Sequence, residues 1–264
     1  MKRPRLFEFE DLSWFPKSIR DAGTDLLRFK WELTGLYKPI VARLQDALIK
    51  TCNENVLDLG SGGGGPVVAI YEDLVRAGLN VRITLTDRFP NLEAFKYASE
   101  RTNGGVAFVA EPVDATRVPP HLSGFRTLFG TLHHFRPDTV RRILHDAMVS
   151  RRPIGMFDFS AFPSPPPLLM FLLSTPPGVL MTVPFVRPFR WSRLFWAYMI
   201  PILPLFVSWD GQVSGLRLYS VRELREIVAS LPSNDYAWEI GSEPFPRCIT
   251  YLIAYPRTGP GTVL

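Results

Sequence analysis

Five glycines follow an acidic residue in the stretch Val56-Leu57-Asp58-Leu59-Gly60-Ser61-Gly62-Gly63-Gly64-Gly65-Pro66. Apolar residues lead into the glycines, and a segment compatible with a helix follows them. This is the pattern of a strand that turns sharply into a helix. Because glycine leaves the backbone bare, a ligand can lie directly against such a turn. We therefore expect the turn to hold a ligand.

Two ligands fit the glycines. Residues 60–65 match the dinucleotide pattern G-x-G-x-x-G, in which backbone N–H groups and a helix N-terminus hold a pyrophosphate. A pyrophosphate gains nothing from a neighbouring carboxylate, yet Asp58 stands two residues before the first glycine. That acid favours a ligand with cationic or hydroxyl donors. S-adenosylmethionine fits, since it has an ammonium, a sulfonium and a ribose but no phosphate.

Further motifs follow in the chain, and together they resemble those of the class I S-adenosylmethionine-dependent methyltransferases. The glycine turn matches the family pattern D/E-x-G-x-G-x-G. Thr86-Asp87 is similar to the acid that binds the ribose hydroxyls, Val113-Asp114-Ala115 to the segment that meets the adenine, and Leu132-His133-His134-Phe135 to the segment beside the methyl-transfer site. The resemblance covers about residues 55–160 and 219–255. It departs at Gly124-Phe125, where many members have an acid before the fourth strand.

The resemblance implies a fold, a cofactor and a set of site residues. The implied fold is a Rossmann-like α/β domain with a seven-stranded, mostly parallel sheet and helices on both faces. The cofactor is S-adenosyl-L-methionine, and no metal is implied. The implied cofactor-binding residues are Asp58, Gly60, Ser61, Gly62, Gly64, Asp87, Arg88, Asp114 and Ala115.

His133 and His134 are the candidates for acceptor activation, because a histidine is poised as a general base near neutral pH. In an extended segment two adjacent side chains cannot both face one pocket. We therefore expect one histidine to face the site and the other to pack or to meet solvent. A sulfonium is already an activated donor, so a base is needed only if the acceptor is a weak acid such as an alcohol or a phenol.

Strand-like and helix-like segments alternate from residue 55 to 159, which predicts a parallel sheet with ligands at the carboxyl ends of its strands. Two amphipathic helices are expected before it, and Trp14 or Tyr37 is a candidate to face the cofactor or the substrate. A capping box at residues 220–223 begins the last helix. Two final strands follow and can pair antiparallel at the sheet edge. We expect one domain with four parts: a helical cap (1–53), a cofactor-binding core (54–159), an apolar insertion (160–218), and a C-terminal helix with strands (219–264).

The insertion is the part that should specify the substrate. It has no charged residue from 159 to 186 or from 194 to 209, and ten prolines lie between Pro163 and Pro204. We expect prolines 176, 177 and 184 to interrupt its first apolar run (166–173 and beyond) and prolines 201 and 204 to break the second (194–207), so a single spanning helix is not expected. Three interpretations remain: a lid over the acceptor pocket, a membrane contact in which Arg187, Arg190 and Arg193 meet anionic headgroups, and an interface with a second copy. The first two favour an apolar or lipid-like acceptor.

Composition narrows the remaining possibilities. The 30 basic residues are scattered, and the net charge is +5, so a nucleic-acid partner is not expected. Cys52 and Cys248 have no metal-ligand spacing and indicate reduced thiols in the cytoplasm, with peripheral membrane contact as a variant. Acids interrupt the basic N-terminus before an apolar signal segment forms.

A small-molecule methyltransferase is the first hypothesis. A non-catalytic scaffold that docks a partner through residues 160–218 and an NAD-type oxidoreductase are the alternatives, and Asp58 disfavours both.

Overall fold

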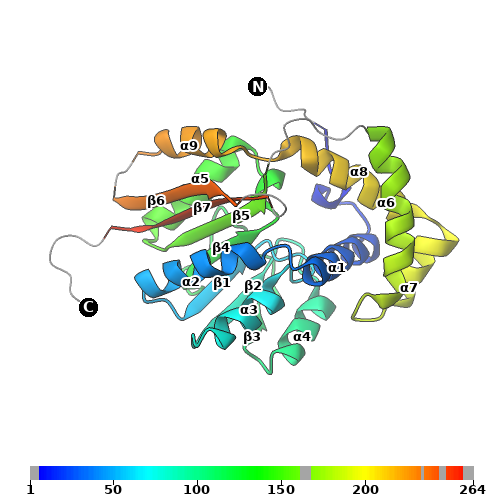
Figure 1. Cartoon of the computed structure of the whole chain (residues 1–264), viewed down its shortest axis with the longest axis horizontal. Coiled ribbons are helices and arrows are strands. Elements are labelled where there is room, and N and C mark those ends of the chain that lie inside the picture. The colour runs from blue at the N-terminus through cyan, green and yellow to red at the C-terminus, as the bar shows by residue number, and fades with distance from the viewer. Residues whose placement is uncertain (1–5, 161–167, 233–234, 244–247, 258–264) are drawn as a thin grey trace.

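A seven-stranded sheet forms the centre of the computed structural model, which describes residues 6–160, 168–232, 235–243 and 248–257 (Figure 1). The strand order is β3-β2-β1-β4-β5-β7-β6. β7 runs antiparallel to both of its neighbours, and the other neighbouring strands are parallel. The predicted sheet and the antiparallel pairing at its edge are confirmed. The strands are β1 (Asn55–Leu59), β2 (Arg82–Thr86), β3 (Val106–Phe108), β4 (Phe125–Phe129), β5 (Ile154–Phe159), β6 (Tyr236–Ser242) and β7 (Ile249–Pro256).

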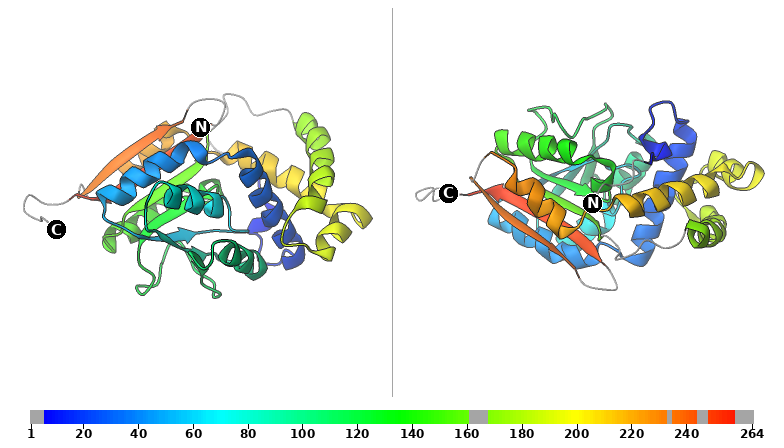
Figure 2. Two further views of the ribbon diagram at one scale, coloured as in Figure 1. Left: turned by 60° about the horizontal axis from the view of Figure 1, so that its bottom comes forward. Right: turned by 90° about the horizontal axis from the view of Figure 1, so that it is seen from above.

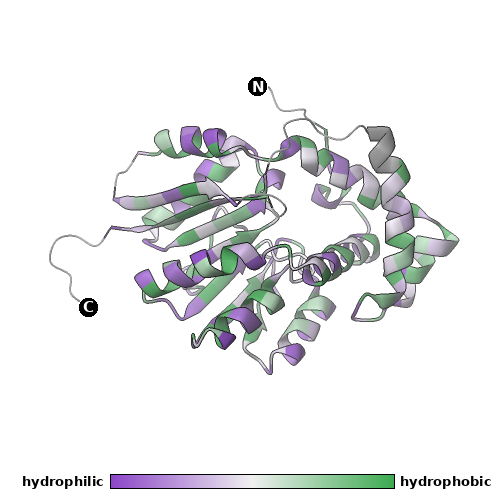
Figure 3. Ribbon diagram, viewed as in Figure 1, coloured by the Kyte–Doolittle hydropathy of each residue, from purple (hydrophilic) through white to green (hydrophobic). Residues whose placement is uncertain are grey.

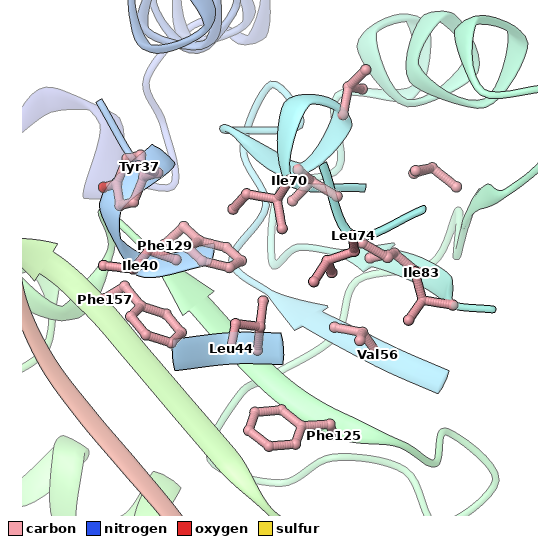
Figure 4. Close-up of a cluster of buried hydrophobic side chains, with 14 of the residues drawn as sticks. Tyr37, Ile40, Leu44, Val56, Ile70, Leu74, Ile83, Phe125, Phe129 and Phe157 are labelled. Atoms are coloured by element: carbon pink, nitrogen blue, oxygen red, sulfur yellow. The ribbon is translucent and has the colours of Figure 1, made fainter. Parts of the chain in front are cut away.

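Helices cover both faces of this sheet, as Figures 1 and 2 show. One face packs against α2 (Val41–Lys50), α3 (Val67–Arg76) and α4 (Leu92–Arg101). The opposite face packs against α5 (Pro137–Val149) and α9 (Val221–Ala229). Figure 4 shows the first of these cores, in which Leu44 and Leu74 lie over Val56 and Phe125. Both faces of the sheet are therefore covered, as expected for a mostly parallel sheet.

A third hydrophobic cluster lies beside the sheet and joins the insertion to the N-terminal residues. Its helices are α1 (Lys17–Thr34), α6 (Leu168–Thr182), α7 (Trp191–Leu194) and α8 (Ile202–Arg217), with a π-helical turn, η5 (Phe195–Met199), after α7. Ile19 and Leu26 of α1 are buried with Val179, Val183 and Phe206 of the insertion. The described part of the insertion therefore packs on α1.

Three of the prolines predicted to interrupt the insertion do not: α6 continues through Pro176 and Pro177, and α8 contains Pro204 in its first turn. Pro201 does break the second apolar run, because it lies between η5 and α8, where the chain bends by 85°. Proline is tolerated in a first turn, because the N–H that it lacks has no partner inside the helix there. Within α6 the missing N–H groups remove helix hydrogen bonds, and the extensive packing of α6 against α8 offsets that loss. The chain does leave α6 before Pro184, which lies in the short turn η4 (Val183–Phe185). Residues 166 and 167, the start of the first apolar run, lie outside the described residues.

Asp25 of α1 ties the insertion to the core through buried charges. Its carboxylate is fully buried, pairs with Arg193, and lies 2.8 Å from Arg190 Nε. Asn91 Nδ2 donates to the same carboxylate over 3.0 Å. Arg190 and Arg193 therefore point inward, so the prediction that they meet membrane headgroups is wrong.

Replacing Asp25 by alanine is expected to lower the free energy of unfolding by about 3–5 kcal/mol, because it leaves two largely buried guanidinium groups without their shared carboxylate. Glu93→Ala is the matched control. Glu93 also pairs with Arg190, at 2.8 Å, but its side chain is 65% exposed, so its loss should cost less than about 1 kcal/mol. Urea unfolding of both variants checks the difference, and equal losses would contradict the buried role of Asp25.

Candidate active site

A cleft of about 1690 Å³ opens at the carboxyl ends of the parallel strands. Single-ligand pockets usually measure about 300–1,000 Å³, so the cleft has room for a cofactor and an acceptor together. Its lining draws on the glycine turn, on the loops after β2, β3 and β4, on α1, and on the N-terminal arm, which we define as residues 6–12. Strand ends at the switch point between β1 and β4 are where this class of sheet binds ligands. Among residues 173–218, whose side chains the structure describes, only Arg217 lines the cleft, so this part of the insertion does not form a lid over it.

The glycine turn needs glycine for two separate reasons. Gly62 has φ of +54°, a left-handed conformation that other residues rarely adopt. At Gly63 an added Cβ would lie 2.6 Å from the backbone carbon and oxygen of Thr24. α1 thus presses directly on the turn. Gly60, Ser61 and Gly62, three of the residues predicted to bind the cofactor, line the cleft, whereas Gly64 does not.

Asp58 lies beneath the turn and does not line the cleft. It is 1% exposed, and its two carboxylate oxygens accept from the Ser61 hydroxyl at 2.6 Å and the Thr127 hydroxyl at 2.8 Å. Burial raises the pKa of Asp58 to about 7, although both hydroxyls act to lower it. In the structure Asp58 stabilises the turn through these hydrogen bonds. Direct contact between Asp58 and the cofactor stays a prediction.

The raised pKa of Asp58 predicts how stability depends on pH. A carboxyl whose folded-state pKa lies above its ordinary value contributes stability below that ordinary value, and the contribution is lost as the pH rises to about 7. Asp58→Asn removes this titration, so the variant should gain stability relative to the unmodified chain between pH 4 and 7, by at most about 1.4 kcal/mol per pH unit. Urea unfolding at several pH values measures the difference. Asp114→Asn, whose native pKa is lowered, should show no such gain, and parallel curves for Asp58→Asn would contradict the assignment.

Asp87 joins the end of β2 to the glycine turn. Its Oδ2 accepts the Gly62 N–H at 2.7 Å, and its Oδ1 accepts the Phe89 N–H at 2.7 Å. The side chain lines the cleft beside Arg88. Each carboxylate oxygen has a second lone pair, so Asp87 can still accept from a ligand. Burial raises its pKa, and the two backbone N–H groups oppose that rise.

Asp114 and Ala115, which are predicted to meet the adenine, line the cleft after β3. Oδ1 of Asp114 accepts the backbone N–H of Thr116 at 2.8 Å and its hydroxyl at 2.7 Å. Partial burial acts to raise the pKa of Asp114, but the Thr116 hydrogen bonds outweigh it and lower the pKa. Asp114 therefore presents a charged, exposed carboxylate at this end of the cleft.

His133 is held by a buried carboxylate at the end of β5. Its Nδ1 lies 2.9 Å from Oδ2 of Asp158, and its backbone N–H donates to the same oxygen at 2.9 Å. Asp158 is 1% exposed and His133 is 5% exposed. With a proton on Nδ1 shared with Asp158, Nε2 is left as a proton acceptor.

His134 lies in a different electrostatic setting, among the acids of the N-terminal arm. Nδ1 lies 2.9 Å from Asp11 and 3.0 Å from Glu8, and Nε2 lies 3.2 Å from Glu10. Burial would lower the pKa of His134, but Glu8 and Asp11 raise it well above the ordinary value. His134 is therefore a cation near neutral pH and has no free nitrogen with which to accept a proton.

The arm itself is fixed by α8. Asp210 accepts the backbone N–H groups of Phe9 and Glu10 at 2.9 and 3.0 Å. Arg217 contacts Glu8 at 3.1 Å and Asp11 at 3.0 Å. The insertion thus shapes the cleft indirectly, by holding the arm that lines it.

Both histidines line the cleft, which differs from the prediction that only one would. The segment is a 3₁₀ turn, η3 (Leu132–His134), and not an extended strand. With about three residues per turn, adjacent side chains there are about 120° apart instead of pointing to opposite sides as in a strand, so both can reach the cleft, and the two ring centroids are 4.3 Å apart.

Trp14 and Tyr37 do not line the cleft, so neither faces a ligand as predicted. Trp14 is 69% exposed on the surface. Tyr37 is 2% exposed and lies behind Gly130, where an added Cβ would come within 2.8 Å of its hydroxyl. Tyr37 lies in the turn before η2 (Lys38–Ile40), and its ring packs in the core near Ile40 and Phe129 (Figure 4).

Glu8, His133 and His134 bring possible metal-ligand atoms within 4.8 Å of one another, the one such grouping found among the described residues. Both Nδ1 atoms are already paired with carboxylates. Hydrogen bonds and ion pairs therefore account for this grouping without a metal ion.

Sequence reasoning missed Asp158 and the acids of the arm. Asp158 was visible as one acid in the otherwise apolar strand of residues 154–159. The arm has no comparable signal, because its partners Asp210 and Arg217 lie about 200 residues further along the chain.

Comparison with known proteins agrees with the fold. The chain matches no family model and no curated protein. Among solved structures it resembles the apo form of the S-adenosylmethionine-dependent methyltransferase SibL (17% identity, TM-score 0.51, 87% of this chain and 58% of SibL). It also resembles a candidate O-methyltransferase from Nostoc punctiforme PCC 73102 (14% identity, TM-score 0.50, 87% of this chain and 59% of that one). The chain spans just under three fifths of the length of these two proteins. Its fold is that of the class I S-adenosylmethionine-dependent methyltransferases.

Proposed function

We propose that the chain is a methyltransferase that uses S-adenosylmethionine to methylate a small molecule. One observation carries the proposal: the glycine turn and Asp87 are hydrogen-bonded to each other and line the same cleft at the strand ends. A ribose needs an acceptor for two neighbouring hydroxyls, and a carboxylate meets that need. An acid after the second strand also binds a ribose in dinucleotide-binding folds, so the feature that disfavours a pyrophosphate here is that the Gly62 N–H, which would bind it, is already donated to Asp87.

In this proposal the cofactor lies across the strand ends. Asp87, beside Arg88, accepts the ribose hydroxyls. The adenine lies against Asp114 and Ala115. The Asp114 carboxylate can accept a hydrogen bond from the exocyclic amine of the adenine. The methionine part follows the bare backbone of Gly60, Ser61 and Gly62, which brings the sulfonium toward the His133 side of the cleft.

His133 is the residue that we place at the reacting atoms, and Asp158 positions it. As the acceptor oxygen attacks the methyl carbon, its proton passes to Nε2 of His133. The carbon–sulfur bond breaks, and its electron pair stays on sulfur to give S-adenosylhomocysteine. Asp158 stabilises the imidazolium that forms, in the way a buried carboxylate supports a histidine base in acyl transfer. His134 is already a cation in this setting, so it binds or orients the acceptor and does not deprotonate it.

The acceptor that we propose has an apolar body and a weakly acidic hydroxyl. The cleft offers apolar contacts from Leu6, Phe7 and Phe135 and charged ones from the arm. A base held by Asp158 is useful only for an acceptor that must lose a proton. The apolar insertion, which suggested this class from the sequence, supports it less directly, because its described part does not reach the cleft except at Arg217.

Calorimetric titration tests the proposal against its two alternatives. We expect S-adenosylmethionine and S-adenosylhomocysteine to bind with one site per chain and NAD not to bind. Binding of NAD alone would support an oxidoreductase. No binding of any of the three would leave the scaffold, and either result would overturn the proposal.

A further inference from the structure

The outer side of the insertion is an exposed apolar surface. Its exposed side chains include Trp191 (78% exposed), Met181 and Met199 (75% each), Phe185 (66%), Leu205 (60%) and Tyr198 (49%). They come from α6, η4, α7, η5 and α8, which are separate in sequence but join through the third hydrophobic cluster. We call these six residues the apolar face. Figures 1 and 3 place their helices at the end of the molecule opposite the β6–β7 edge.

The inward-facing side chains of the same elements are already buried in the protein. Val179, Val183, Ala197 and Leu203 are buried against α1 and the arm. The apolar face is therefore not a core surface that a small shift could bury. Large exposed apolar side chains gathered in one part of a soluble protein indicate a contact with a partner or a membrane.

We propose that the apolar face docks on a lipid bilayer and enters its interfacial layer without crossing it. Residues 159–209 contain no acid at all, so no carboxylate meets the bilayer in this part of the chain. Trp and Tyr are the side chains that favour the boundary between lipid and water. A lipid bilayer, unlike a protein partner, does not require hydrogen-bonding groups from the surface that docks on it.

A protein partner fits this surface less well. Interfaces between proteins carry about one hydrogen bond per 100–200 Å². The apolar face offers few groups for that purpose, since the hydroxyl of Tyr198 is already donated to the carbonyl of Leu180. Five of the six residues in the apolar face are Trp, Phe, Met or Leu.

The backbone arrangement also favours contact within the interfacial layer. No single helix among the described residues is long and apolar enough to cross a membrane. The pair Trp191–Met199 and Ile202–Arg217 passes that test only when taken together, and it is bent by 85°. A bend of this size lets one helix of the pair lie along a membrane surface while the other helix turns back into the protein.

The charges nearby predict what kind of lipid is needed. Arg190 and Arg193 are committed to Asp25. Arg187 is exposed, and its Nη1 donates to the carbonyls of Pro184 and Val186. With one exposed arginine in residues 159–209, binding should depend mainly on apolar insertion and only weakly on anionic lipid.

Vesicle co-sedimentation tests the proposal with the full chain. We expect the unmodified protein to pellet with phosphatidylcholine vesicles, with less than a threefold gain in affinity when a quarter of the lipid is phosphatidylglycerol. The triple variant Met181→Ser, Trp191→Ser, Met199→Ser should bind at least tenfold more weakly. The matched control is Leu33→Ser, Ile49→Ser, Val149→Ser, which changes three exposed apolar residues (70%, 58% and 70%) on α1, α2 and α5, and it should bind like the unmodified protein.

Two results would overturn the proposal: no pelleting of the unmodified protein, or equal losses in the two triple variants. Sedimentation equilibrium without lipid distinguishes a second copy as the partner. A dimer that the face variant abolishes, together with no vesicle binding, would assign the surface to self-association. Unfolding midpoints of both variants report folding. The proposal does not depend on methyl transfer, and calorimetry with S-adenosylmethionine tests that activity separately.

Discussion

Asp87→Ala is expected to weaken S-adenosylmethionine binding by roughly 100-fold. The variant removes the acceptor proposed for both ribose hydroxyls, and hydrogen bonds to a charged group contribute about 1.5–3 kcal/mol each. It also frees the Gly62 N–H that Asp87 now accepts at 2.7 Å, which loosens the turn along which the methionine part lies. Calorimetric titration of the variant measures the loss directly.

Asp114→Ala is the control for this prediction. Its carboxylate is exposed and is proposed to accept one hydrogen bond from the adenine, so the loss should be roughly tenfold or less. Unchanged affinity in Asp87→Ala, with normal folding, would mean that the ribose lies elsewhere.

Asp158→Asn is expected to lower kcat by roughly 10²- to 10⁴-fold with any acceptor that the unmodified chain methylates, the range that general-base catalysis contributes. Asparagine keeps the shape of the side chain but removes the charge that stabilises a His133 imidazolium. Nδ1 of His133 now lies 3.1 Å from Oδ1 and 2.9 Å from Oδ2 of Asp158. In the variant an amide nitrogen replaces one of these two oxygens, so the ring loses its fixed tautomer. The affinity for S-adenosylmethionine should change little.

Two comparisons separate this catalytic effect from general damage. His133→Gln should lower kcat to a similar extent, and combining it with Asp158→Asn should add little, because the pair acts as a unit. Glu111→Gln, at an exposed loop position, should leave kcat unchanged. If Asp158→Asn kept full activity, the acceptor would need no base and the role given to His133 would be wrong.

The parts of the fold that the sequence predicts well are those decided by local pattern. Alternating strands and helices, the glycine turn and the capping box at Ser220 all depend on residues within about ten positions of one another. The structure contains that capping box, with Ser220 and Glu223 bonded reciprocally. The acids after β2 and β3 also reached the cleft, because parallel strands deliver their carboxyl ends to the same edge of the sheet.

The parts that sequence reasoning missed depend on contacts between distant segments. Asp58 was expected at the mouth of the turn, but two hydroxyls, one of them 69 residues away, hold it beneath the turn. The proline-rich helix α6 forms because α8 packs along it, which no local propensity predicts. The arginines of the insertion turned inward because Asp25, from α1, supplies their countercharge.

The most direct test of the account is a crystal structure of the chain with S-adenosylhomocysteine. We predict that the ribose hydroxyls lie within about 3.2 Å of the Asp87 carboxylate, the normal range of such hydrogen bonds, with the sulfur on the His133 side of the cleft. A product bound away from the glycine turn, or a ribose that does not contact Asp87, would contradict the proposed cofactor site.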